Sequence, residues 1–172
     1  MAPILFVVIP LIAYVPMFGY ETYIAFRRIG KPRDKGGAYL HATWESTHTF
    51  LILSVNYFMW LYSSAIVSVG HAVFLPLLVF GLAFITRSIL YIYLFYIKST
   101  NRPTPGLDAL FALMHVIIAV CLLYTIIQTL HVLMTGNYQP NDLLPTLLWP
   151  GIILTVPLIS VPLYFLYKTK SK

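Results

Sequence analysis

One short stretch of the sequence, His41 to His48, places two histidines, a glutamate and a tryptophan close together. On a helix, His41, Glu45 and His48 fall at i, i+4 and i+7, which is one face. Glutamate and histidine can take up and release protons, because burial and neighbouring charges tune these side-chain types toward neutrality. Since ionisable residues inside a membrane usually mark ion or proton pathways, the stretch indicates proton transfer at a membrane boundary.

The composition that surrounds this stretch is that of an integral membrane protein. Of the 172 residues, 59% are hydrophobic and only 9% are charged, whereas soluble domains have about 25% charged residues. A spanning helix needs about 20 mainly apolar residues. We therefore expect an all-α membrane protein whose single domain, residues 1–172, forms a bundle of five transmembrane helices. The expected spans are Pro3 to Phe26, His41 to Ala65, Ala72 to Ile97, Leu107 to Thr135 and Leu143 to Tyr167.

Basic residues cluster in every second connection between these spans and in the C-terminal tail. The net charge of +6 is concentrated in the loop Arg27 to Gly37, in the loop after Ile97 and in the C-terminal tail. The other connections, including an expected turn at Ser68 to Gly70, carry no Lys or Arg. The positive-inside pattern predicts an N-terminus outside and a C-terminus in the cytoplasm. We expect a multi-pass protein of the plasma membrane. Basic residues confined to short loops argue against nucleic acid as a partner.

Further ionisable residues lie inside the apolar segments. At a rise of about 1.5 Å per residue, Arg87 lies about 15 Å and His115 about 12 Å from the cytoplasmic helix ends, and Glu21, Glu45 and His48 lie nearer to them. In the inner half of the membrane these groups can neutralise one another. They predict a protonatable chain that opens to the cytoplasm, in which the arginine holds a carboxylate ionised. The structural alternatives are an ion-pair network that fixes packing, and snorkelling side chains.

The histidines leave a haem-binding interpretation open. His71 and His131 lie near the outer ends of the third and fourth spans, and His48 and His115 form an inner pair. Two such pairs could hold two haems, although any two histidines near helix ends meet this criterion, and packing or interfacial histidines are the simpler interpretation. The sequence has no zinc-binding His-Glu-x-x-His, no paired cysteines and no Gly-rich phosphate loop, so we expect no metal site and no catalytic residue.

Several runs resemble subunit II of the cytochrome bd-type quinol oxidases. Gly19-Tyr20-Glu21, a basic loop and then Trp44-Glu45 are similar to the family's Gly-aromatic-Asp in its first helix and to the Trp-Asp that opens its second. Leu82 to Arg87, with aromatic residues after it, is similar to the aliphatic-Arg…aromatic end of the third helix. Gly136-Asn137-Tyr138 and Leu147 to Pro150 are compatible with the fourth and fifth helices.

The chain also departs from the family's pattern. Glu21 and Glu45 stand where aspartates are usual, and His48 stands where the family has an acid or an amide. The family's subunit is longer and is built from two similar helical halves, so this chain resembles one half alone. Either a second copy or another small half-length subunit then supplies the missing surface, or the complex is smaller.

The resemblance implies a supporting role in quinol oxidation coupled to dioxygen reduction. In the family, subunit I carries haems b and d and the quinol site, and subunit II ligates no haem but helps to conduct cytoplasmic protons to the oxygen-reducing haem. Expected partners are therefore a haem-bearing subunit I, a quinone and the lipid bilayer, with no cofactor bound by this chain's own ligands. The proton-pathway candidates are Glu21, Trp44, Glu45, His48 and Arg87, with His41 and His115 as secondary candidates.

Two other functions stay open. A haem-binding b-type cytochrome membrane anchor would show a haem spectrum when it is purified alone. A dimeric half of a proton-coupled transporter would use the Glu-His-Arg cluster as its proton site, and it would move a solute in vesicles without any haem partner.

Overall fold

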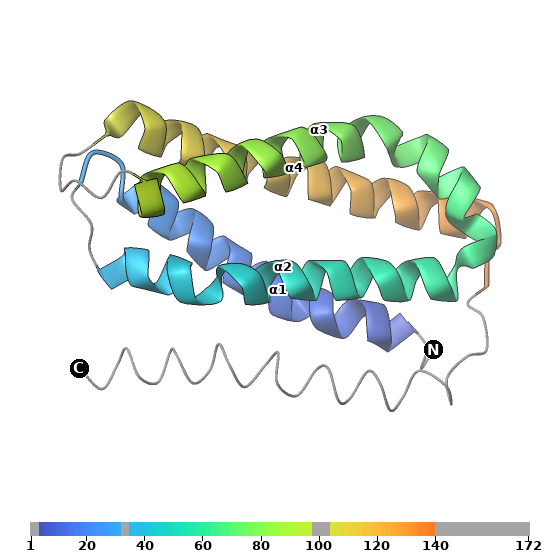
Figure 1. Cartoon of the computed structure of the whole chain (residues 1–172). Coiled ribbons are helices and arrows are strands. Elements are labelled where there is room, and N and C mark those ends of the chain that lie inside the picture. Colours follow the sequence, from blue (N-terminus) through green and yellow to red (C-terminus); the bar gives the residue numbers. More distant parts are fainter. Residues whose placement is uncertain (1–3, 32–34, 98–103, 140–172) are drawn as a thin grey trace. The chain divides into compact units, whose positions relative to one another are not determined.

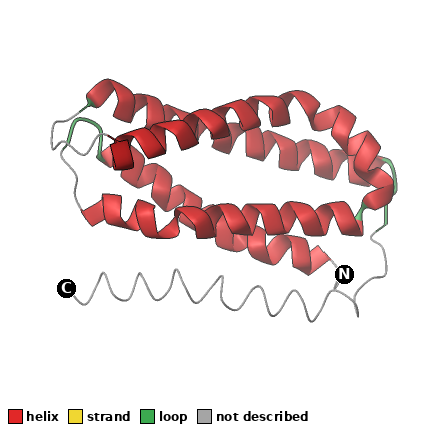
Figure 2. Ribbon diagram, in the orientation of Figure 1, coloured by secondary structure: helices red, strands yellow, loops and turns green. Residues whose placement is uncertain are grey.

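The computed structural model describes residues 4–31, 35–97 and 104–139. All regular structure in these ranges is helical, and none of it is strand (Figure 2). Three of the described segments are long and apolar enough to cross a membrane, namely Leu5–Arg27, Ser63–Ile97 and Pro105–Thr135. The described part of the chain thus has the all-α fold and the apolar helices of a membrane protein. The fifth expected span, Leu143 to Tyr167, lies outside the described residues.

Two helices begin and end close to the expected bounds. Helix α1 covers Leu5–Arg27, and helix α4 covers Pro105–Thr135. Proline suits the first turn of α4, because the N–H that it lacks has no partner inside the helix there. The third expected span corresponds to helix α3, Ile66–Ile92, which continues into a short π-helix, η3, at Tyr93–Ile97.

Helix α2 covers Lys35–Leu61 and begins before the expected second span, which starts at His41. The helix therefore includes Lys35 to Gly37, which the sequence pattern assigns to the basic loop. The reason is that hydropathy marks where the apolar core of the membrane begins. A helix can extend beyond that point, because water and lipid headgroups satisfy its end groups.

The turn expected at Ser68 to Gly70 is wrong in position. These residues lie inside α3, and the chain turns earlier, at Tyr62 and the short 3₁₀-helix η2 at Ser63–Ala65. At the end of α2, the Tyr62 backbone N–H still donates a helical hydrogen bond to the Phe58 backbone oxygen, at 2.9 Å. Serine and glycine are ordinary in transmembrane helices, so they do not end a helix in an apolar run.

The described residues fall into two compact units, which we describe separately. The α1–α2 unit contains residues 4–21, 35–64 and 139, and the α3–α4 unit contains residues 22–31, 65–97 and 104–138. Helix α1 thus belongs mostly to the first unit, and its last turns belong to the second.

In the α1–α2 unit, the two helices run antiparallel and side by side (Figure 1). Near the start of α1, the Ser54 hydroxyl donates to the Val7 backbone oxygen at 2.7 Å, and the Phe6 and Tyr57 rings pack edge to face. Near the end of α1, Glu21 contacts the first half of α2 through Thr47. Helix α2 therefore follows α1 along most of its length.

In the α3–α4 unit, α3 and α4 are also antiparallel neighbours (Figure 1). Ser68 and Tyr138 share a hydrogen bond at one end, and the Phe95 and Phe111 rings pack together at the other. The buried positions of α3 and α4 recur at helical spacing, as expected for a single contact face on each helix. They are Val69, Val73, Ala83, Arg87, Leu90 and Tyr91 on α3, and Asp108, Phe111, Ala112, His115, Ile118 and Cys121 on α4.

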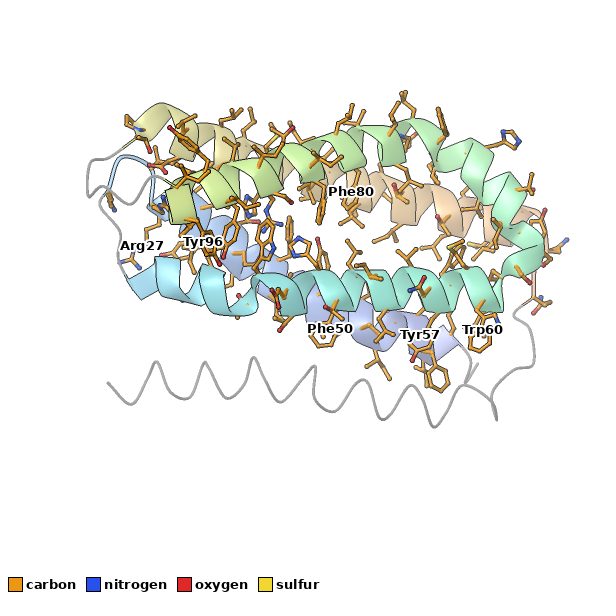
Figure 3. The ribbon with its side chains drawn as sticks, in the orientation of Figure 1. Arg27, Phe50, Tyr57, Trp60, Phe80 and Tyr96 are labelled. Atoms are coloured by element: carbon orange, nitrogen blue, oxygen red, sulfur yellow. The ribbon has the colours of Figure 1, made fainter. Side chains whose placement is uncertain are left out.

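The outward faces of α3 and α4 are apolar. Residues such as Val67, Ile85 and Val120 are more than half exposed, and such large exposed apolar surfaces are typical of helices that contact lipid. Aromatic residues lie near helix ends, as Figure 3 shows for Trp60 on α2 and Tyr96 in η3, which are 50% and 59% exposed. That placement fits interfacial aromatic belts.

Candidate functional site

The centre of the α1–α2 unit's polar contacts is Glu21. Its side chain is fully buried, as are those of Thr43 and Thr47 on α2. Glu21 Oε1 lies 2.5 Å from the Thr47 hydroxyl oxygen and 3.3 Å from the Thr43 hydroxyl oxygen. The two threonines are four residues apart, so they share one face of α2. That face supplies two hydroxyl groups to one carboxyl group.

The Thr47 hydroxyl has a choice of acceptors. Its oxygen lies 2.5 Å from Glu21 Oε1 and 3.0 Å from the Thr43 backbone oxygen. A threonine hydroxyl has one proton to donate and can also accept. When it donates to Glu21, it stabilises the ionised carboxylate. When it donates to the Thr43 backbone, its oxygen can accept a hydrogen bond from a protonated Glu21. One arrangement of heavy atoms therefore accommodates both protonation states of Glu21.

The stretch His41 to His48 does not lie entirely on the face of α2 that contacts Glu21. Glu45 is exposed, and at 100° per residue it lies on the side of α2 opposite Thr43 and Thr47. The structure therefore does not bring Glu45 to Glu21. The side chain of His41 lies outside the described residues.

Trp44 and His48 form a local pair on α2. The two rings pack with centroids 4.5 Å apart, and His48 Nδ1 is hydrogen-bonded to the Trp44 backbone oxygen. Both side chains are half-buried. The tryptophan thus fixes the orientation of the imidazole, next to the turn of α2 that carries Thr47.

Arg87 and His115 form a buried pair between α3 and α4. Arg87 Nε donates to His115 Nε2 at 2.9 Å, and His115 Nδ1 is 2.9 Å from the Phe111 backbone oxygen. This network assigns a neutral imidazole with its proton on Nδ1. Both ring nitrogens of His115 therefore contact protein atoms in this structure. Both side chains are fully buried.

A second buried pair, which the sequence analysis missed, joins Arg28 to Asp108. Their side chains are only 8% and 3% exposed and form a salt bridge at 3.2 Å, and the Arg28 guanidinium lies 4.2 Å from the Phe95 ring centroid. Asp108 occupies the first turn of α4, where an acid is favoured by the helix dipole. An acid at the start of an apolar span was a signal for Asp108, but nothing in the sequence indicated Arg28 as its partner.

The backbone supports this pair. Gly30 has φ +71°, a conformation that L-residues with side chains rarely adopt. A Cβ atom at Gly30 would lie 3.8 Å from the Cβ atom of Pro105, at the start of α4. The turn after α1 therefore closes onto the first turn of α4, which places Arg28 beside Asp108.

The remaining histidines do not join these clusters. The His71 and His131 side chains are exposed, on α3 and α4. Within the residues that the structure describes, no group of three or more His, Cys, Asp or Glu side chains could hold a metal ion.

No protein-family model, curated protein or solved structure matches the chain. The likeness to bd-type oxidases therefore rests on the sequence motifs, of which Glu21, Trp44 and Arg87 fall on described residues with the contacts given above.

Proposed function

We propose that the chain is a small membrane subunit of a bd-type quinol:dioxygen oxidoreductase complex in the plasma membrane. It pairs with a haem-bearing subunit and helps to conduct cytoplasmic protons to the oxygen-reducing haem. Quinol is oxidised and dioxygen is reduced to water in the partner, which holds haems b and d. The observation that carries this proposal is the buried Glu21 carboxyl group, whose threonine partners suit both of its protonation states.

The chemistry of Glu21 supports a proton-transfer role. A carboxyl group inside a membrane is costly, and such groups usually serve transport or proton relay. Hydroxyl partners that donate or accept allow a proton to be taken up and released without moving a helix. Glu21 is also the acid of Gly19-Tyr20-Glu21, one of the runs in which the chain resembles the family.

The other unit supports the same proposal in a different way. The oxidase-like arginine, Arg87, is buried and bonded to His115, which suits a charged group that organises the inside of a membrane protein. We further propose five spans, with the N-terminus outside and the C-terminus in the cytoplasm, and the alternating basic loops support this topology.

The first test is spectroscopic. The chain is purified from its own cells in mild detergent, and a reduced-minus-oxidised spectrum is recorded before and after its partners are stripped. We expect haem bands that stay with a larger partner and vanish from the isolated chain. Haem bands that stay with this chain would overturn the proposal in favour of a b-type cytochrome. A sample without haem at either stage would overturn it in favour of a proton-coupled transporter.

A further inference from the structure

Helix α2 is the least apolar of the four described helices, and it packs along α1. It does not qualify as a span by hydropathy, unlike the other three segments. However, it contacts α1 near both ends of α1, through Ser54 with Val7 and through Thr47 with Glu21. Helix α1 is long and apolar enough to span, and a helix that packs along a spanning α1 lies at the same depths in the bilayer.

The polar residues of α2 divide between two faces. The face against α1 carries Thr43, Thr47 and Ser54, which are buried and bond to α1. The opposite face carries three exposed polar residues, Glu45, Thr49 and Asn56, which fall at i, i+4 and i+11 on one side of the helix, and the exposed Ile52 lies among them at i+7. We name these three residues the polar stripe.

The polar stripe is unsuited to lipid. The Thr49 hydroxyl donates to the Glu45 backbone oxygen at 2.7 Å. In the described part of the chain, neither the Glu45 carboxyl group nor the Asn56 amide has a hydrogen-bond partner. Hydrocarbon cannot supply one, and an ionisable group within a span almost always faces protein or a water-filled cavity. By contrast, the exposed residues midway along α3 and α4 are apolar, such as Ile85 and Val120.

We propose that the polar stripe is the docking surface for a transmembrane helix of a different subunit. That helix carries a cationic side chain opposite Glu45 and a hydrogen-bonding side chain opposite Asn56. The geometry leaves Glu45 pointing outward, where a Lys, Arg or His from a neighbour at the same depth completes an ion pair. A partner helix covers the stripe and shields it from lipid.

Charge complementarity selects a different subunit over a second copy of this chain. In a two-fold dimer within the membrane, each residue meets residues at its own depth. From Trp44 to Leu61, α2 contains no Lys or Arg. Its one histidine there, His48, is half-buried and bonded to the Trp44 backbone. Two copies that meet through the polar stripe would therefore place Glu45 next to Glu45.

The same reasoning excludes the chain's own last apolar run as the occupant. Residues 143–167 contain no Lys, Arg or His. They offer no cation to Glu45, whereas a helix of a separate subunit can carry one. This inference does not depend on haem in the partner, so it can hold even if the proposed oxidase function is wrong.

The first test is site-specific cross-linking in native membranes. A photo-reactive phenylalanine replaces Thr49 in the stripe or, as the matched control, Val120 on the apolar face of α4. We expect the Thr49 position to cross-link to a single other membrane protein, at a span that contains Lys, Arg or His, and the Val120 position to give no protein product. Cross-links to a second copy, to residues 143–167, or equally from both positions would overturn the proposal.

The second test uses charge reversal in the purified complex. We expect Glu45→Lys to lower the amount of retained partner roughly tenfold or more, because a charge pair at the interface becomes a repulsion. Asn56→Leu should lower it less, and Ile85→Leu should leave it unchanged. Replacing the cross-linked cation of the partner by Glu should restore binding to the Glu45→Lys chain.

The outcomes separate this inference from the proposed function. A Glu45→Lys, Asn56→Leu double variant that keeps the partner in full overturns the docking surface, whether or not that partner contains haem. Loss of a partner that has no haem supports the docking surface and contradicts the oxidase. If Glu45→Lys does not accumulate, Asn56→Leu and the cross-link decide, because each leaves Glu45 in place.

Discussion

The two units bury their polar groups in different ways. In the α1–α2 unit, a carboxyl group faces hydroxyls that can donate or accept, at Thr43 and Thr47. In the α3–α4 unit, a permanently charged guanidinium holds each contact, Arg87 with His115 and Arg28 with Asp108. A hydroxyl can follow a change of protonation by rotating, whereas a guanidinium stays charged and fixes its partner.

This difference assigns different roles to the two units. The guanidinium contacts join α4 to α3 and to the turn after α1, so their loss should mainly reduce stability and assembly. The Glu21 contacts can change protonation at constant geometry, so their loss should mainly reduce turnover. Substitutions at these contacts test this distinction, and the expected loss of stability decreases from Asp108 to Glu21.

Asp108→Leu should have the largest effect. It leaves the buried Arg28 without its carboxylate, and breaking a buried ion pair costs about 3–5 kcal/mol. We expect a large fall in the fraction of folded, monodisperse protein, measured by size-exclusion chromatography in detergent and by thermal unfolding. A variant as stable as the native chain would show that the salt bridge does not hold the start of α4.

Arg87→Leu should be the next most damaging. It removes the donor to His115 Nε2 inside the α3–α4 contact, and hydrogen bonds to charged groups contribute about 1.5–3 kcal/mol. We expect poorer assembly with the partner and a lower unfolding temperature, with Ile85→Leu on the exposed face of α3 as the control. Normal stability combined with lost turnover would contradict the structural role and move Arg87 to the proton pathway.

Thr47→Val should lower stability by only about 1 kcal/mol, because it is nearly isosteric and removes one hydroxyl. The same change should slow turnover, since the group that accommodates both forms of Glu21 is gone. Thr47→Ser keeps the hydroxyl and should restore the rate. Equal rates in the Val and Ser variants would contradict the role of the hydroxyl.

Glu21→Gln should change stability least, because the amide keeps the size of the side chain and can still bond to both threonines. Turnover of the complex should nevertheless fall at least tenfold, given that positioned acid–base groups contribute about 10²–10⁴ in rate. The measurement is steady-state quinol oxidation with matched amounts of assembled complex. Unchanged turnover would remove Glu21 from the proton pathway.

Much of the fold could be predicted from the sequence. Apolar length placed α1 and α4 within a few residues, because hydropathy reports directly on the membrane core. The same signal could not locate the turn at η2, since Tyr62 to Ala65 lies in a nearly continuous apolar run that contains no charge. It also could not set the start of α2, which extends beyond the apolar core.

The site was predictable only in part. Glu21, Arg87 and His115 stand out as ionisable groups in apolar runs, and the structure buries all three. Thr43 and Thr47 gave no such signal, because threonine is common in spanning helices. Polar residues on both faces of α2 hid which face meets α1, so the expected grouping of Glu45 with Glu21 was wrong. The Arg28–Asp108 pair depends on a turn whose closure the sequence does not reveal.

An infrared difference spectrum of the complex, recorded between its reduced and oxidised forms, can show whether Glu21 changes its protonation state. If Glu21 takes up and releases a proton, the spectrum contains a carboxylic C=O band that shifts in D₂O, disappears in Glu21→Gln and persists in Thr47→Ser. The same carboxylic bands in the native and Glu21→Gln complexes would contradict the claim that Glu21 changes its protonation state.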